Sequence, residues 1–316
     1  MTGMMIAAAG AEMVRGRELD EGMQAQFAAY VQAKPKTKET YMKALRQFYA
    51  WLSCNGIRQP GMADLVAWRD ALAAEKKPST VNVYLTAVKL FFQFLQDMGL
   101  YPNVADRVKR VKSDTRYHKR DALTAEQARD VLEGIDRDSL KGKRDFAMVL
   151  LMVTAGLRDI EVVNANVEDF RPVRGSMVLF LKGKGYSENN AEFVKVGRKA
   201  EKALRDYLRS RKAKDGEALF TSVANRDAGQ RMTTRSVSRI CKGAMIGAGY
   251  ESDRLSAHSL RHTAATLALL GGEDIRAVQQ QLRHTNVNTT LIYTHDISRD
   301  ANSCSTTAEN ALDVAI

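Results

Sequence analysis

The stretch LRHTNVNTTLIYTH, residues 282–295, decides which kind of fold this chain is expected to adopt. It places His284 and Tyr293 nine residues apart around a polar run, at a point where an ordinary helical domain could simply end. A tyrosine in such a place is by default a buried aromatic side chain. The rest of the chain must therefore supply the reasons for a chemical role.

Polar residues upstream of this stretch stand at the ends of predicted helices. Arg158 closely follows Gly156, which is the stop signal of a helix predicted over residues 144–155. Further along, the sequence SAHSLRH opens another helix, in which His258 and Arg261 are three residues apart and share one face. Both arginines are thus expected at helix junctions and not on free surface.

A lysine-bearing β-hairpin is predicted between these two helices. The turn sequence KGKG, residues 182–185, separates short apolar runs at 177–181 and 193–196 that can pair as strands. With this lysine, the chain carries two arginines, two histidines and a tyrosine that together suit phosphoryl transfer without a metal. Guanidinium groups hold the nonbridging phosphate oxygens in two-pronged contacts, the tyrosine hydroxyl attacks, and lysine and histidine move protons.

Charge and composition favour a polyanionic partner. The 316 residues carry a formal net charge of +11 and give a sequence pI of about 9.5, which suits nucleic acid because bound Lys and Arg release its counterions. The longest strongly apolar run, residues 146–156, is far shorter than the roughly 20 residues that span a bilayer. The start MTGMMIAAAG lacks the basic region of a secretory signal, so no membrane association and a cytoplasmic location are expected. Three scattered cysteines indicate neither a disulfide framework nor a cysteine metal site.

The first third of the chain has the apolar periodicity of a helical bundle. Helices are predicted near residues 21–31, over 40–52, around 65–72, and from a cap at Ser79-Thr80 to Gly99. After Pro102 the composition changes to a basic segment that we interpret as an interdomain linker lying along a phosphate backbone. Ordinary solvated surface is the competing interpretation for the basic residues that we single out as candidate DNA contacts: Lys43, Arg46, Arg107, Lys109, Arg110 and Lys112.

Four strings in one order resemble the tyrosine recombinases, or phage-type integrases. They are TAGLRDIEV from residue 154, KGKG from 182, HSLRHTAATLALLGG from 258, and LRHTNVNTTLIYTH from 282. Each string alone is weak, whereas their order and separations are specific. The resemblance implies a mainly α fold, in which a SAM-like core-binding bundle precedes an α+β catalytic domain of the DNA breaking-rejoining type with a small β-hairpin or sheet.

The expected domain organisation follows from this resemblance. Residues 1–20 form a leader expected to be disordered, 21–105 the core-binding DNA-binding domain, and 106–121 the basic linker. Residues 122–297 form the catalytic domain, and 298–316 a tail that is a candidate for docking on a neighbouring protomer. The short leader favours an Xer-like or small integrase without a separate arm-binding domain.

The resemblance also assigns roles to single residues. Arg158 matches the first catalytic arginine, Glu161 the acidic residue that supports it, and Lys184 the hairpin lysine that protonates the leaving 5′ oxygen. Lys182 is the alternative if the hairpin register differs, because the returning strand AEFVKV lacks the usual arginine and proline.

The remaining matches complete the implied site. His258 assists proton transfer, Arg261 binds the phosphate, His284 donates a hydrogen bond to the scissile phosphate, and Tyr293 is the nucleophile. One departure affects His284. Arg283 stands where the family normally has glycine, so we expect a helix end that differs from the left-handed ending that glycine favours.

The implied activity is site-specific recombination of double-stranded DNA through a covalent 3′-phosphotyrosine, by a tetramer on two recombination sites, without ATP, metal or cofactor. Two alternatives stay open. A type IB topoisomerase-like enzyme would share the chemistry but relax supercoils as a monomer. A non-catalytic DNA-binding protein would keep the residues as a vestige, although a pure binder has no use for a nucleophile beside paired arginines.

Zinc binding is the remaining alternative for the histidine helix. His258 and His262 have the i, i+4 spacing of a zinc helix. Ser259, however, occupies the position where a metalloprotease has its glutamate, and Arg261 would put a cation beside the metal. We therefore interpret His262 as a buried, hydrogen-bonded structural residue and expect no metal.

Overall fold

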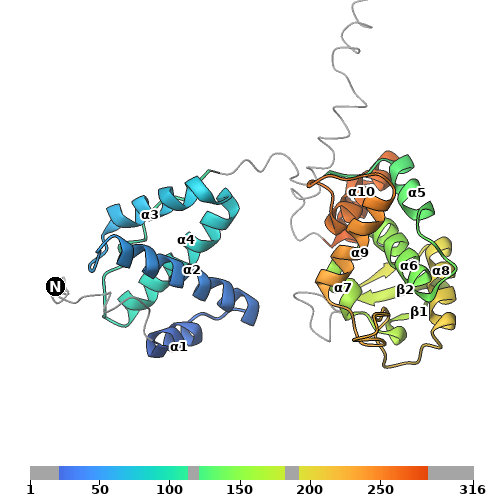
Figure 1. The fold of residues 1–316 in the computed structure, drawn as a ribbon, viewed down its shortest axis with the longest axis horizontal. Helices are drawn as coiled ribbons and strands as arrows, with labels where there is room; N and C mark the ends of the chain where they lie inside the picture. The colour runs from blue at the N-terminus through green and yellow to red at the C-terminus, as the bar shows by residue number, and fades with distance from the viewer. Residues whose placement is uncertain (1–20, 113–120, 182–191, 284–316) are drawn as a thin grey trace, which may run out of the picture. The chain divides into compact units, whose positions relative to one another are not determined.

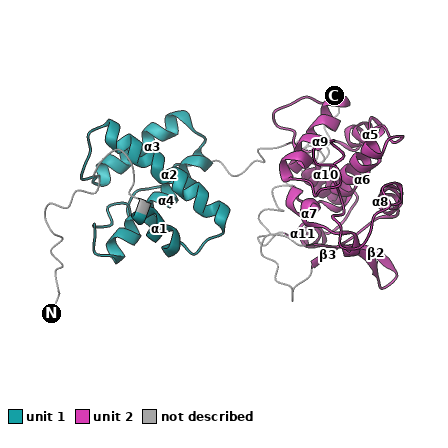
Figure 2. Ribbon diagram, turned by 60° about the horizontal axis from the view of Figure 1, so that its bottom comes forward, with its two compact units in different colours: residues 1–115 teal, residues 116–316 magenta. Residues whose placement is uncertain are grey.

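The computed structural model describes residues 21–112, 121–181 and 192–283. The chain forms two compact units, Met1–Thr115 and Arg116–Ile316, which Figure 2 shows in teal and magenta. Several predicted features lie outside the described residues: the leader 1–20, most of the catalytic hairpin tip including Lys182 and Lys184, the residues His284 and Tyr293, and the tail 298–316.

Unit 1 is a helical bundle, as the periodicity predicts. Its helices are α1 (Glu21–Tyr30), α2 (Pro35–Cys54), α3 (Met62–Glu75) and α4 (Pro78–Asp97). The helices α2 and α4 pack against each other around a core of aromatic side chains, in which the rings of Phe48 and Trp68 meet edge to face at 5.0 Å. This core fixes the arrangement of all four helices.

The start of α4 differs from the predicted cap. The sequence suggests a cap at Ser79-Thr80, but the helix begins at Pro78, and the residue before it, Lys77, is extended. Proline suits the first helical position because its fixed φ fits the helix and its missing N–H would have no helical partner there. The same arrangement of Lys34 and Pro35 begins α2.

The first part of the predicted linker belongs to unit 1. Val108 is 1% exposed within the core of the bundle. The side chain of Asn82 on α4 donates to the carbonyl of Val111 and accepts from its N–H, both at 2.9 Å. Composition alone could not show this, because the segment is rich in basic residues. What anchors it is one buried valine of its own, Val108, and the side chain of Asn82 on α4.

Unit 2 is mainly helical, and its elements surround one long buried helix (Figure 1). That helix, α6 (Leu140–Ala155), is buried throughout residues 147–153 and packs against α8 and α10. The other elements of unit 2 are α5 (Ala125–Glu133), α7 (Asp159–Asn164), the 3-10 helix η1 (Val167–Asp169), β1 (Phe170–Val173), β2 (Ser176–Leu181), β3 (Glu192–Lys195), α8 (Arg198–Ser210), α9 (Thr234–Gly247), α10 (Ala257–Leu270) and α11 (Ile275–Leu282).

The β region of unit 2 has three strands, in the order β1-β2-β3, and both pairings are antiparallel. The predicted pair is present, with Leu179 of β2 opposite Val194 of β3. The strand β1 is not among the predicted strands. Its four residues FRPV include a proline and lie on the edge of the sheet with little apolar alternation. Among the described residues, no helix combines the length and apolar character needed to cross a bilayer.

Candidate active site

The end of α6 places Arg158. Gly156 ends the helix in the left-handed conformation, with φ of +63°, and the chain then turns so that Arg158 becomes the residue before α7. A Cβ atom on Gly156 would lie 2.5 Å from Cδ2 of Leu282. Glycine therefore provides both the required backbone angle and the space for α11 to approach the end of α6.

Glu161 orients Arg158. Its Oε2 accepts the backbone N–H of Arg158 and its Oε1 accepts Nη1 of the Arg158 side chain, each at 2.8 Å. The carboxylate is 1% exposed, whereas 35% of the Arg158 side chain is exposed. The predicted supporting residue is thus in contact with its arginine, and the arginine keeps an edge open to solvent.

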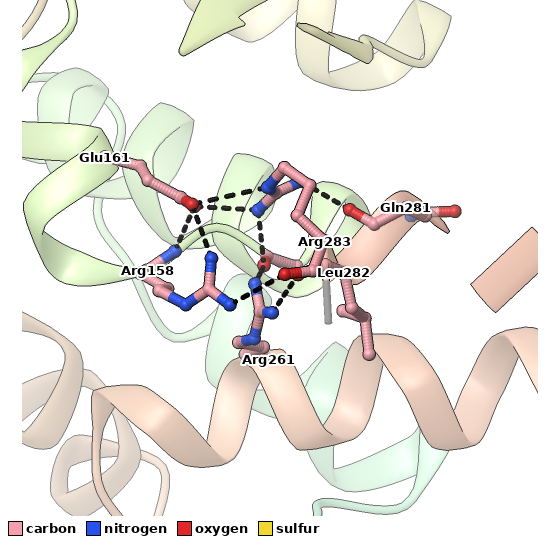
Figure 3. A network of polar contacts seen from close by, with 7 residues as sticks. Arg158, Glu161, Arg261, Gln281, Leu282 and Arg283 are labelled. Atoms are coloured by element: carbon pink, nitrogen blue, oxygen red, sulfur yellow. Dashed lines mark hydrogen bonds and ion pairs between the residues drawn. The ribbon is translucent and has the colours of Figure 1, made fainter. Parts of the chain in front are cut away.

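Arg261 comes to the same place from α10. It is 1% exposed, and its Nη1 donates to the carbonyl oxygen of Gly156 at 2.5 Å, while Nη2 donates to the carbonyl of Leu282 (Figure 3). Its partners thus come from the end of α6 and the end of α11. The structure therefore brings Arg261 of α10 together with Arg158 and Glu161, which belong to the start of α7.

A third arginine, whose side chain sequence analysis did not place in the site, completes this network. Arg283 ends α11 in the left-handed conformation, with φ of 55° and ψ of 48°. The expectation of a different helix end is therefore wrong. Its guanidinium donates from Nη2 to Oε2 of Glu161 at 2.7 Å and from Nε to Oε1 at 3.3 Å (Figure 3). These contacts to a buried acid hold a conformation that glycine would adopt more readily.

The electrostatics of the network favour an anion. Burial by itself raises the pKa of Glu161, but the positive charge of Arg283, together with the hydrogen bonds and charge of Arg158, outweighs burial and leaves that pKa below its ordinary value. One carboxylate thus stands among three guanidinium groups, counting Arg261. The network keeps a positive excess, which suits the nonbridging oxygens of a phosphate.

The two histidines of α10 differ in burial. His258, in the first turn, is exposed, whereas His262 is 3% exposed, and their ring centroids are 4.9 Å apart. Nowhere in residues 21–112, 121–181 and 192–283 do three or more His, Cys, Asp or Glu side chains cluster so that they could hold a metal ion.

The candidate DNA contacts lie on the surface of unit 1. The structure leaves these residues exposed: Lys43, Arg46, Arg107, Lys109, Arg110 and Lys112. Three of them form hydrogen bonds within unit 1: Arg46 donates to the Met42 carbonyl, the Lys109 carbonyl accepts from Arg69, and Arg110 donates to Thr86. Exposure makes contact with a phosphate backbone possible for all six side chains.

Family models match both units of the chain. The model of the phage integrase family matches residues 121–299, and the model of the phage integrase N-terminal SAM-like domain matches residues 25–99. The first match spans the network around Glu161 and continues through Tyr293. The second covers the helical bundle.

Similar proteins and structures agree with these matches. The chain is 33% identical over 231 residues to tyrosine recombinase XerC of Thermodesulfovibrio yellowstonii, covering 70% of this chain and 72% of that protein. It is 30% identical over 275 residues to tyrosine recombinase XerC of Pelobacter propionicus, covering 83% and 85%. The solved post-cleavage complex of XerH site-specific recombinase with palindromic difH substrate has the same fold, with a TM-score of 0.73, 19% identity, and coverage of 94% of this chain and 91% of that one.

The fold, the arginine network and the sequence matches together define an enzyme of the DNA strand transferase class. The chain belongs to the phage integrase family and is a tyrosine-type site-specific recombinase. The topoisomerase and vestigial alternatives are not favoured, since both XerC relatives are recombinases that match most of the chain.

Proposed function

We propose that this recombinase cleaves and rejoins double-stranded DNA through a covalent bond between Tyr293 and a 3′ phosphate. The observation that carries the proposal is the convergence of Arg158 and Arg261 on the ends of α6 and α11, directly before the segment that contains the tyrosine. Paired guanidiniums bind the two nonbridging oxygens of one phosphodiester and stabilise the charge that develops on them in the transition state.

The proposed reaction conserves the energy of the phosphodiester bond. The Tyr293 hydroxyl gives up its proton by way of His258 as its oxygen bonds to phosphorus. The bond from phosphorus to the 5′ oxygen breaks, and the departing oxygen takes a proton from Lys184. Rejoining reverses these steps with a 5′ hydroxyl as nucleophile, so neither ATP nor a redox partner is needed. In this scheme His258 assists proton transfer, and His284 donates a hydrogen bond to the phosphate.

The proposed partners are two DNA recombination sites and further copies of this chain. A solved lambda integrase tetramer bound to a Holliday junction shares the fold, with a TM-score of 0.64 and 17% identity. A ring of four subunits on two sites would allow strands to be exchanged in pairs. Exposed basic residues of unit 1, with Lys43 and Arg46 on α2, would contact the backbone, and a cytoplasmic location would follow from such a substrate.

The nucleophile is tested with a nicked suicide substrate, which traps a covalent protein–DNA adduct. Wild-type protein should form the adduct, and Tyr293→Phe should bind the DNA but form none, because it loses only the attacking oxygen. Tyr250→Phe is the matched control, since its hydroxyl bonds to Asp130 in the same unit at 2.5 Å. An adduct that persists in Tyr293→Phe would show that another residue attacks.

A further inference from the structure

Arg283 combines an uncommon backbone conformation with a buried charged side chain. It holds a positive φ of 55°, which side chains other than glycine seldom adopt, and its side chain is only 4% exposed. Burial of an arginine is tolerated when its charge and donors are matched by partners. The partners of Arg283 are part of the candidate active site.

The first effect of Arg283 is electrostatic. Glu161 alone would neutralise Arg158, because the carboxylate accepts both the side chain and the backbone N–H of that residue. Arg283 contacts the same two carboxylate oxygens, at 2.7 and 3.3 Å. It thereby offsets the negative charge of Glu161, so that Arg158 retains its attraction for a phosphate while its orientation stays fixed.

The second effect of Arg283 is mechanical. Its guanidinium donates from Nη2 to the carbonyl of Gly156 at 3.3 Å and from Nη1 to the carbonyl of Gln281. Its own carbonyl accepts Nη2 of Arg158 at 3.2 Å. One residue therefore connects the end of α6, the start of α7 and the end of α11 (Figure 3). The next residue along the chain is His284.

We propose that Arg283 is a positioning residue for strand cleavage, which holds Arg158 through Glu161 and fixes the left-handed end of α11. This inference rests on the proposed function, since it concerns the same site. Arg283 itself contacts no reacting atom in the scheme. It acts by keeping the groups that do so in the geometry required for attack.

Three substitutions separate the roles of the charge, the side-chain length and the backbone angle. Arg283→Met keeps the apolar stem and removes the charge, Arg283→Lys keeps a charge, and Arg283→Gly removes the side chain but fits the left-handed backbone. Arg174→Gly is the matched control, because Arg174 also has a positive φ, of 47°, at the turn between β1 and β2. Each variant is assayed on the suicide substrate at saturating DNA, alongside its affinity for the same DNA and its thermal unfolding.

The expected result is a loss in rate and not in binding. Arg283→Met and Arg283→Gly should form adduct on the order of 100-fold more slowly at saturating DNA, which is the cost typical of a small displacement of catalytic groups. Their affinities should change little, Arg283→Lys should recover part of the rate, and Arg174→Gly should match wild type. In a double-mutant cycle with Glu161→Gln, the combined loss should be much smaller than the product of the single losses, because both residues act through one contact.

The opposite results would overturn the proposal. These are a wild-type rate for Arg283→Gly or Arg283→Met at saturating DNA, a loss that disappears once the unfolded fraction is taken into account, or fully multiplicative effects of Arg283 and Glu161. Failure of the proposed nucleophile gives a different pattern. If Tyr293→Phe still forms adduct while folded Arg283→Met does not, the tyrosine assignment fails and the role of Arg283 stands.

Discussion

The buried side chain of Arg261 forms a hydrogen bond with the backbone of Gly156, in which Nη1 donates to the carbonyl oxygen at 2.5 Å. The arginine comes from α10 and the glycine ends α6. Two residues later the chain reaches Arg158, so the contact fixes the separation between the two predicted catalytic arginines. The backbone angle of Gly156 is therefore part of the construction of the site.

Replacing Gly156 with alanine should destabilise unit 2 more than an ordinary glycine replacement. A left-handed alanine costs about 1–2 kcal/mol, and its Cβ would also press on Leu282, which adds about 1–3 kcal/mol as overpacking. Gly175→Ala is the control, since Gly175 has φ of +76° but open space where the Cβ would be. Chemical denaturation should show the larger loss for Gly156→Ala, and equal losses would mean that the contact with Leu282 relaxes without cost.

Glu161 should make the protein less stable as the pH falls. Its pKa is lowered in the folded state, so as the pH falls the unfolded state takes up its proton first. The stability contributed by Glu161 is therefore complete above its ordinary pKa and is lost as the pH falls through the lower, folded value. Denaturation measured from about pH 6 to pH 3 should show this loss in wild type and a weaker dependence in Glu161→Gln.

At neutral pH, Glu161→Gln should itself lower the free energy of unfolding. It leaves Arg158 and the buried Arg283 without a carboxylate, and removing one partner of a buried ion pair typically costs about 3–5 kcal/mol. Glu201→Gln is a control, because Glu201 forms a more exposed pair with Arg205 within α8. Similar small losses in both variants would contradict a structural role for the Glu161 network.

Local signals in the sequence predict much of this architecture. Apolar periodicity predicts the bundle, Gly156 predicts the C-terminal end of α6, and the string SAHSLRH predicts the start of α10. The start of α6 lies at Leu140, four residues before the predicted start at 144. The strand β1 is missed because four residues containing Pro172 give no periodic signal. Its existence depends on pairing with β2, which is a tertiary contact.

The site shows the same limit. Arg158 and Glu161 are three residues apart, so their contact is predictable from helical spacing. The contact between Glu161 and Arg283 joins residues 122 positions apart, and no local pattern indicates it. The available signal was an arginine at a position where the resembling family normally has glycine, and its meaning depended on knowing which acid lies nearby.

The basic segment after Pro102 should contribute to DNA affinity without regard to sequence. Changing Arg107, Lys109, Arg110 and Lys112 to alanine should weaken binding to specific and random duplexes alike. It should also flatten the log–log salt dependence by up to about 0.9 per lost phosphate contact. A variant that removes four exposed basic residues of α8 controls for net charge: Arg198, Lys199, Lys202 and Arg209. Equal slopes in wild type and the segment variant would return the four residues to ordinary solvated surface.

Cleavage should not require a divalent metal. Arg158 and Arg261 supply positive charge of the kind that two-metal nucleases obtain from magnesium, so adduct formation should continue in excess EDTA. The suicide substrate reports this step directly. Complete loss of cleavage, restored by one specific divalent ion, would contradict the assignment of these arginines.

The segment beyond Tyr293 should matter for assembly and not for binding to a single site. It ends in ALDVAI, and Leu312, Val314 and Ile316 could anchor in an apolar groove of a neighbouring subunit. Head-to-tail docking of this kind would connect the active sites around a ring of four, so that only half of them act at once. A frayed end without function is the competing interpretation.

Removal of residues 308–316 distinguishes these interpretations of the tail. Truncated protein should bind one half-site as wild type does, because the segments proposed to contact DNA are unchanged, but it should form fewer synaptic complexes and complete recombination more slowly. A full-length variant with Leu312, Val314 and Ile316 changed to serine should show the same defect, which ties it to the apolar side chains and not to chain length. Recombination of two full sites at the wild-type rate by the truncated protein would exclude a role for the tail in assembly.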